Sequence, residues 1–264
     1  MTSPRLEIAV QDTAGARIAR EHGADRVELC QGLGLGGLTP SQGLIEACVA
    51  EGIGVHPLIR PRGGGFSYSP LETEAMLIDI RRAVAAGARG VVIGAVCAGD
   101  AGLDSSVLST LIAAARETAA DTEITVHRCV DVLLGAGADP AQLVGQLIGL
   151  GVDRVLSSGG ASTAGRGIGV LHLMHEAADG RLQIQAGGGV RLEDIPALLR
   201  LDGIHLSART SVSTGASGPG GGESAYDATS PELVAAAAAA LVAPGRAANP
   251  DASTISDSDV SRAT

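Results

Sequence analysis

The chain of 264 residues contains no lysine, and all 19 of its basic residues are arginines. A Schiff-base aldolase, a pyridoxal-phosphate enzyme and a Walker-type phosphate loop each need a lysine amine, so these three classes are excluded. Aromatic residues make up only 1% of the chain against 45% hydrophobic residues, so the core must be aliphatic. The net charge of −10 and the shortage of aromatic stacking surfaces argue against nucleic acid as a partner.

Other features are also missing. No apolar run approaches the length of about 18 residues that spans a bilayer, so we expect no membrane partner. The N-terminal stretch MTSPRLEIAV enters a strand-like run without the apolar segment of a signal peptide, which predicts a cytoplasmic protein. In that compartment the four cysteines are expected to be free thiols. No GxSxG or CxxC motif occurs, so neither an α/β-hydrolase elbow nor a paired-thiol motif is indicated.

A repeat organises the chain. The segments GADRVELC, GARGVVIG and GVDRVLSS begin at Gly23, Gly87 and Gly151, at a regular spacing of 64 residues. Each places a helix-ending glycine and one or two polar residues before a short apolar run. A period of this length fits two βα units of roughly 30 residues each.

Eight strands are predicted between helical patterns. They cover residues 6–10, 26–30, 54–60, 90–96, 123–129, 154–159, 182–188 and 203–208. The alternation predicts an α/β fold, a single (β/α)8 TIM barrel over residues 1–243, with a disordered C-terminal tail at 244–264. Residues 213–224, rich in glycine and serine, are expected to form a flexible surface loop. A doubly wound open sheet is the alternative, but the chain lacks the glycine-rich fingerprint that follows its first strand.

Charged residues alternate along several of these strands. Because alternate side chains share a face, and the outer face of a barrel strand packs under helices, we expect the charged face to point inward. Five residues lie at the carboxyl ends of strands 2, 3 and 5, where barrel active sites are built; these candidate catalytic residues are Glu28, Arg60, Arg62, His127 and Asp131. For Glu7 and His205, a structural role inside the barrel and a role in a ligand site are both open.

A chemical role can be assigned to each candidate. Arg60 and Arg62 would hold an anion through forked hydrogen bonds. Glu28 and His127 would form an acid/base pair, and Asp131 would orient a neighbour. After strands 7 and 8, the blocks QAGGGV and HLSAR offer Gly187, Gly188 and Ser207 as a backbone site for a phosphate-like group.

The sequence resembles the copper homeostasis protein CutC family. The blocks that carry the resemblance are GADRVELC, GGLTPSQG, HPLIRPRGGGFSYS, VHRCVD, RVLSSGG, QAGGGV and HLSAR, spread over residues 6–242. The resemblance implies a cytosolic TIM barrel and Cu(I) bound by cysteine thiolates, with Cys30 matching one proposed ligand. The other proposed cysteine corresponds to Ala9 here, so Cys129, Cys97 or a second subunit would have to supply the second sulfur that Cu(I) prefers.

Two functions therefore remain open. The first, implied by the resemblance, is a copper homeostasis protein that binds Cu(I) at Cys30 and Cys129. The second is a barrel enzyme, a lyase, isomerase or hydrolase, that acts on a small anionic or sugar-like substrate. A homodimer is expected on general grounds, because the two-fold dimer is the commonest soluble oligomer.

Overall fold

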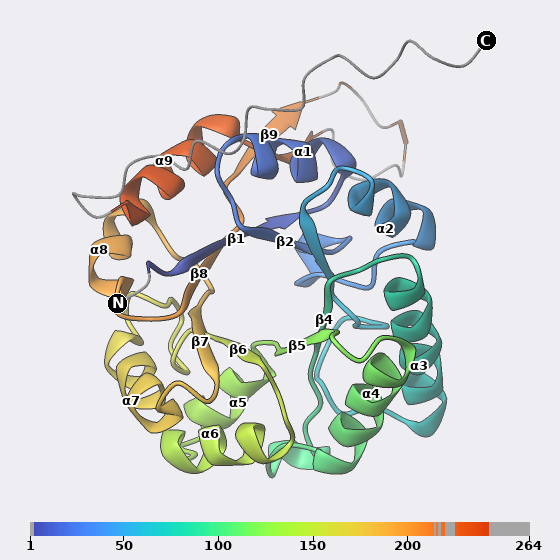
Figure 1. Cartoon of the computed structure of the whole chain (residues 1–264), viewed down its shortest axis with the longest axis vertical. Coiled ribbons are helices and arrows are strands. Elements are labelled where there is room, and N and C mark those ends of the chain that lie inside the picture. Colours follow the sequence, from blue (N-terminus) through green and yellow to red (C-terminus); the bar gives the residue numbers. More distant parts are fainter. Residues whose placement is uncertain (1–2, 214, 216–217, 220–224, 243–264) are drawn as a thin grey trace, which may run out of the picture.

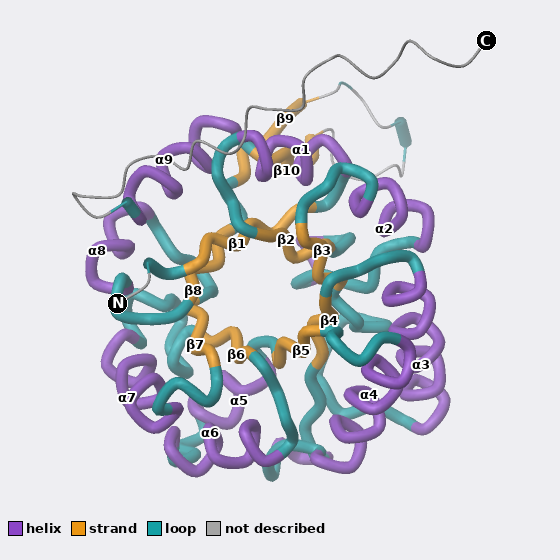
Figure 2. The backbone as a smooth tube through the Cα atoms, in the orientation of Figure 1, coloured by secondary structure: helices purple, strands orange, loops and turns teal. Residues whose placement is uncertain are grey.

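Eight parallel strands form a ring at the centre of the molecule, with helices around its outside (Figures 1 and 2). This computed structural model describes residues 3–213, 215, 218–219 and 225–242. Hydrogen-bonded neighbours follow the order β3-β2-β1-β8-β7-β6-β5-β4, and a parallel bridge between Leu58 and Val92 joins the two ends of the sheet. The strands are β1 (Arg5–Val10), β2 (Arg26–Leu29), β3 (Gly54–Pro57), β4 (Gly90–Ile93), β5 (Glu123–Val126), β6 (Arg154–Ser157), β7 (Gln183–Ala186) and β8 (Gly203–Leu206). The predicted TIM barrel is confirmed, and the open-sheet alternative is wrong.

The helices begin where the sequence supplies side-chain caps. Asp104 accepts a hydrogen bond from the Val107 N–H at 3.0 Å, and Ser69 and Glu72 form a reciprocal capping box. The helices are α1 (Thr13–Glu21), α2 (Gln42–Val49), α3 (Pro70–Ala85), α4 (Ser105–Thr118), α5 (Cys129–Gly135), α6 (Pro140–Gly149), α7 (Ile168–Ala178), α8 (Ile195–Leu198) and α9 (Pro231–Leu241). Short 3-10 turns lie at Leu33–Leu35, Ala98–Asp100 and Leu192–Asp194.

The 64-residue repeat corresponds to turns that need glycine. Gly23, Gly87 and Gly151 have φ angles of 93°, 95° and 74°, in the region that other residues rarely adopt. Two residues after the first and third of these glycines, Asp25 and Asp153 accept hydrogen bonds from N–H groups of the preceding strands. The repeated glycine-to-aspartate spacing therefore fixes each entry from helix to strand.

The interior of the barrel is polar, whereas the layer between strands and helices is aliphatic. Glu7 is fully buried and pairs with Arg26 at 2.6 Å. Glu123 pairs with Arg154 at 2.9 Å and with His56 at 3.2 Å. Buried charges are tolerated when they are paired and hydrogen-bonded, so the expected inward charged face is stable because its members partner one another.

The structure also differs from the sequence expectations. The strand predicted at 123–129 ends at Val126, because the backbone turns at Arg128 and Cys129 begins α5. An antiparallel hairpin of β9 (Arg209–Ser213) and β10 (Ala225–Thr229), which was not predicted, flanks the expected surface loop and lies beside α1 (Figure 1). Its strands are short, polar and mostly exposed, so they lack the buried alternation that marks a strand.

Two expectations fall largely outside the described residues. Most of the predicted loop at 213–224 belongs to the undescribed part of the chain, as do the predicted tail at 244–264 and the domain boundary at residue 243. Within the described residues, no helix combines the length and the apolar character needed to cross a membrane.

Candidate functional site

A cavity of about 300 Å³ opens at the carboxyl ends of the barrel strands. Five of the residues predicted for a catalytic or binding role line it, and they reach it from different strands and loops. These five are Glu28, Arg60, His127, Gly188 and Ser207. The structure therefore brings these five predicted residues together at the carboxyl end of the barrel.

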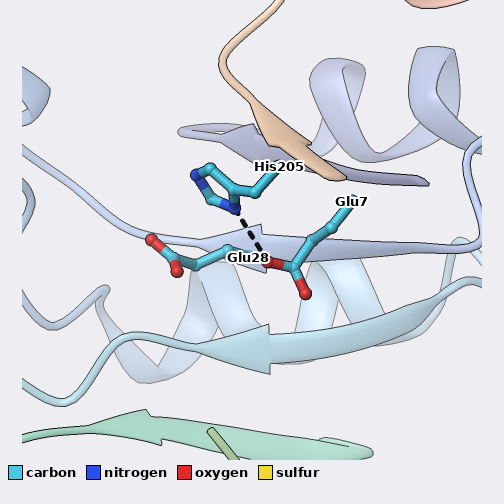
Figure 3. A group of neighbouring side chains, drawn as sticks. All are labelled: Glu7, Glu28 and His205. Carbon is cyan, nitrogen blue, oxygen red and sulfur yellow. Dashed lines mark hydrogen bonds and ion pairs between the residues drawn. The ribbon is translucent and has the colours of Figure 1, made fainter. Parts of the chain in front are cut away.

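Glu28 lies beside a hydrogen-bonded pair of side chains. His205 Nδ1 contacts Glu7 Oε1 at 2.8 Å, and Glu28 projects from the neighbouring strand toward the same imidazole (Figure 3). One nitrogen or oxygen atom from each of the three side chains lies within 4.8 Å of the others. Glu28 Oε2 is buried and has no hydrogen-bond partner among the described residues. Glu28 itself lines the cavity, so a ligand bound there would lie beside a carboxyl group that the described residues leave unpaired at this oxygen.

The pKa values of the neighbouring Glu28 and Glu7 carboxyl groups are shifted in opposite directions. Burial raises the pKa of Glu28 to about 7, and the nearby Glu7 carboxylate adds to the effect, although His205 opposes it. Burial also works against ionisation of Glu7, but Arg26 and His205 outweigh it and hold the pKa of Glu7 well below its usual range. Burial disfavours the charged form of His205, yet the Glu28 and Glu7 carboxylates raise its pKa overall. Neighbouring groups with pKa values pushed apart are typical of acid/base sites.

His127 occupies a different part of the wall. Its Nδ1 accepts a hydrogen bond from the Cys129 backbone N–H at 3.1 Å, and Phe66 packs on the ring with centroids 4.8 Å apart. Burial, aided by the Arg60 charge, lowers the pKa of His127 to about 3. The ring is therefore neutral at physiological pH, and its buried Nε2 has no partner among the described residues.

Arg60 lines the cavity, and its guanidinium is hydrogen-bonded to backbone carbonyls of two loops at the mouth. Its guanidinium donates to the carbonyls of Leu35, Gly37 and Gly64, at 3.0, 2.9 and 2.8 Å, and lies 5.1 Å from the Phe66 ring centroid. The buried guanidinium thus fixes the loops after β2 and β3 around the mouth.

Arg62 and Asp131 do not line the cavity. Arg62 pairs with Glu72 and donates to Gly65 and Ser67 carbonyls of its own loop. Asp131 accepts from the Ser157 hydroxyl at 2.6 Å and from the backbone N–H groups of Ser158 and Gly160. Both residues brace loops, and their predicted roles toward a ligand can only be indirect.

Arg128 and Arg209 line the cavity but were not predicted. Arg128 donates from Nε to Asp131 at 2.7 Å and from Nη2 to Ser158 at 3.0 Å, while Nη1 has no partner among the described residues. Arg209 pairs with Asp227 of the hairpin at 2.7 Å. The block VHRCVD contained Arg128 between two predicted residues, which was the available signal. Arg209 was visible only as the last residue of HLSAR.

Two of the three residues predicted for a phosphate-like group, Gly188 and Ser207, lie in the cavity lining. Gly188 and Gly189 have φ angles of 95° and 62°, which favour glycine, and Arg128 lies against Gly188. Gly187 does not reach the cavity, because its N–H is bonded to the Ser157 carbonyl at 2.9 Å.

The thiols predicted for copper have unsuitable surroundings. Cys30 packs among Leu58, Val92 and Leu33, and Cys129 lies under the His127 ring, so neither side chain lines the cavity. Burial raises the pKa of Cys30 to about 12 and also raises that of Cys129. Cu(I) is bound by thiolates. Because both side chains lie outside the cavity lining, these two residues do not form a Cu(I) site at the cavity, and among the described residues no cluster of three metal-ligating side chains includes a cysteine.

Comparison with known proteins assigns the chain to a family. The sequence model of the CutC family matches residues 4–212. The chain belongs to the CutC family. A CutC family protein of Bacteroides fragilis is 39% identical over 215 residues, covering 80% of this chain and 82% of its own. A second, from Agrobacterium fabrum, is 42% identical over 194 residues, covering 74% of each chain.

A solved CutC structure gives the same result. The CutC protein of Streptococcus agalactiae, whose name refers to copper homeostasis, superposes with a TM-score of 0.69 at 28% identity. The alignment covers 77% of this chain and 98% of that one. The resemblance expected from the motifs is confirmed at the level of family and fold.

Proposed function

We propose that this CutC-family chain is an enzyme that acts on a small anionic, oxygen-rich molecule bound at the carboxyl-end mouth of the barrel. The observation that carries the proposal is that three residues lining one cavity each have a buried polar atom without a partner among the described residues: Glu28 Oε2, Arg60 Nε and His127 Nε2. Leaving such atoms unpaired costs free energy, on the order of 1–3 kcal/mol each. That cost is accounted for if a ligand completes the site.

Charge and size define the class of ligand. The Arg128 and Arg209 guanidiniums lie at the rim next to the Gly188–Gly189 backbone, and each is paired with an aspartate. Arg128 Nη1 has no partner among the described residues, so it can donate a hydrogen bond to an anionic group there. A cavity of about 300 Å³ lies at the small end of the range for ligand sites, so it suits a metabolite rather than a polymer. In this proposal Arg60, Arg62 and Asp131 hold the loops that shape the site.

Binding of phosphate compounds tests the proposal. We expect inorganic phosphate and a panel of triose and pentose phosphates to raise the melting temperature of the wild type in thermal-shift assays, confirmed by calorimetry. Arg128→Ala should remove most of the shift, whereas Arg81→Ala, which removes an equal charge from the exposed surface of α3, should leave it unchanged. An absence of any shift in the wild type, or an equal shift in Arg128→Ala, would contradict an anion site at this mouth.

Copper binding is the second candidate function. It is supported by the copper homeostasis name of the Streptococcus agalactiae relative. The motif resemblance implies Cys30 as one of the ligands. Against it stand the buried, protonated state of Cys30 and Cys129 and their position behind the cavity wall. A cytoplasmic location and a homodimer remain predictions from the sequence.

A further inference from the structure

We propose that the cavity catalyses proton transfer at a carbon atom next to a carbonyl group, with Glu28 as the base and His127 as a neutral hydrogen-bond donor to the carbonyl oxygen. This inference rests on the proposed function and names its reaction. The substrate class is a small α-hydroxy aldehyde or ketone that carries a phosphate group at its other end. The His127 role also replaces the acid/base role that the sequence suggested for this residue.

The first step of the argument is the tautomer of His127. A backbone N–H can only donate, so the contact from Cys129 N at 3.1 Å requires an unprotonated Nδ1 with its lone pair directed at that hydrogen. The neutral ring must then carry its proton on Nε2. Nε2–H has no acceptor among the described residues. The ring therefore presents an uncharged N–H donor and has no free lone pair with which to act as a base.

The second step is the fixed position of this donor. Phe66 packs on one side of the imidazole, and on another side the ring lies so close to Gly94 that a Cβ at that position would collide with it. The Cys129 N–H that sets the tautomer is at the first turn of α5. A donor that does not reorganise during the reaction stabilises developing negative charge more effectively than water does.

The third step is the state of Glu28. Glu7 uses both of its oxygens, because Oε1 accepts from His205 and Gln185 at 2.8 and 2.6 Å and Oε2 accepts from Arg26 at 2.6 Å. Glu28 has no hydrogen bond of this kind, and its Oε2 is free in the buried wall. Of the two neighbouring carboxylates, only Glu28 can take up a proton without breaking an ion pair. His205, oriented by Glu7, is the positioning residue beside it (Figure 3).

The fourth step is that the cavity lacks an activated nucleophile for covalent catalysis. The chain contains no lysine amine, and the thiols of Cys30 and Cys129 lie outside the cavity lining. Ser207 lines the cavity, but neither of its neighbours in the motif HLSAR is a base, and the structure records no bond from a histidine to its hydroxyl within the described residues. Covalent catalysis is therefore poorly supported, whereas a base and an oxyanion donor are both present.

The electron movement is balanced without a further reactant. The Glu28 carboxylate takes the proton from the carbon, the C–H electron pair forms a carbon–carbon double bond, and the carbonyl π pair moves to the oxygen. That oxygen, now negative, accepts the hydrogen bond from His127 Nε2. Once the hydroxyl proton has passed between the two oxygens, Glu28 returns its proton to the former carbonyl carbon, and the carbon that lost the proton becomes the new carbonyl carbon. The net reaction is an aldose–ketose isomerisation.

An enediolate analogue provides the test. Phosphoglycolohydroxamate mimics the charged intermediate, whereas 2-phosphoglycolate and inorganic phosphate supply only the anionic parts. We expect calorimetry to show that the wild type binds the hydroxamate at least about 100-fold more tightly than phosphoglycolate. Transition-state analogues bind to enzymes with affinities about 10²-fold or more higher than those of substrates. His127→Ala should abolish this preference, and His127→Gln, which keeps an N–H donor, should retain part of it.

The outcomes separate this inference from the proposed function. If phosphate and phosphoglycolate bind but the hydroxamate gains nothing, the reaction proposed here is wrong and the anion site stands. If none of the three binds, both proposals fail. A measurement on the wild type covers the case in which the variants do not fold: ¹⁵N NMR should find His127 neutral with its proton on Nε2 between pH 5 and pH 8. A proton on Nδ1, or a charged ring at pH 6, would overturn the donor role.

Discussion

The buried carboxyl group of Glu28 predicts an unusual link between pH and stability. In the folded protein the pKa of Glu28 is raised from its ordinary value of 4.5 to about 7, chiefly by burial. A carboxyl group whose pKa is higher in the folded state penalises folding once it must ionise. The penalty is absent well below pH 4.5, grows as the pH rises toward 7, and is complete above it. Replacing Glu28 with glutamine removes the charge and should remove this penalty.

The size of the effect follows from the two pKa values. One pKa unit corresponds to 1.36 kcal/mol, so ionisation of Glu28 costs about 3 kcal/mol at pH 8 and about 1 kcal/mol at pH 5. The groups that face Glu28 are His205 from β8, which favours its ionisation, and Glu7 from β1, which opposes it. Any packing change caused by the glutamine is the same at both pH values. The difference between the two pH values, about 2 kcal/mol, therefore isolates the buried charge.

Urea denaturation followed by circular dichroism, at pH 5 and pH 8, measures this difference. We expect Glu28→Gln to gain about 2 kcal/mol more free energy of unfolding at pH 8 than at pH 5, relative to the wild type. Glu117→Gln removes the same charge from an exposed position on α4 and should show no such difference. An equal change at both pH values would refute the raised pKa of the buried carboxyl group. Stability gained by removing a charged group is the pattern expected where a residue is kept for activity.

Two further predictions concern the barrel interior and the thiols. Glu7→Gln removes the carboxylate that pairs with Arg26 inside the barrel, and the uncompensated arginine should lower the free energy of unfolding by about 3–5 kcal/mol in the same assay; a loss below about 1 kcal/mol would contradict the importance of this ion pair. In a titration of the reduced protein with Cu(I) against a chromogenic chelator, we expect no competition from the wild type, Cys30→Ala or Cys129→Ala, because both thiols are buried and protonated. Tight one-to-one binding that disappears in either variant would instead establish copper binding by these thiols.

The sequence contained enough information to predict the barrel but only part of the site. The repeat at Gly23, Gly87 and Gly151 marks the helix-to-strand turns, because the positive φ angles at these positions favour glycine. Strand alternation placed Glu28 and His127 at the mouth, because parity follows directly from backbone geometry. The strand predicted at 123–129 was too long, because β5 ends at Val126 and Cys129 already belongs to α5. Parity holds only while the strand continues, and local composition did not mark where it stopped.

Residues on loops could not be assigned in this way. Arg62 turns to Glu72 and Asp131 turns to the loop after β6, and these partners are 10 and 26 residues or more away along the chain. Arg128 reaches the cavity because Asp131 and Ser158 hold its guanidinium there. Which of several charged residues in one motif faces the ligand is decided by such partners from other elements. Their pairing depends on tertiary structure, which the motif does not encode.

Three carboxylates inside the barrel show how the fold selects one for chemistry. Hydrogen bonds from His56 and Arg154 hold the pKa of Glu123 well below its usual range, and Arg26 with His205 does the same for Glu7 despite its burial. Both are ionised structural groups, fixed by arginines that line the opposite, amino-terminal end of the barrel. Glu28 stands nearest the mouth and has no arginine bonded to it among the described residues. It is therefore the carboxyl group whose pKa, about 7, lies close to physiological pH, and its Oε2 has no partner in the described part of the chain.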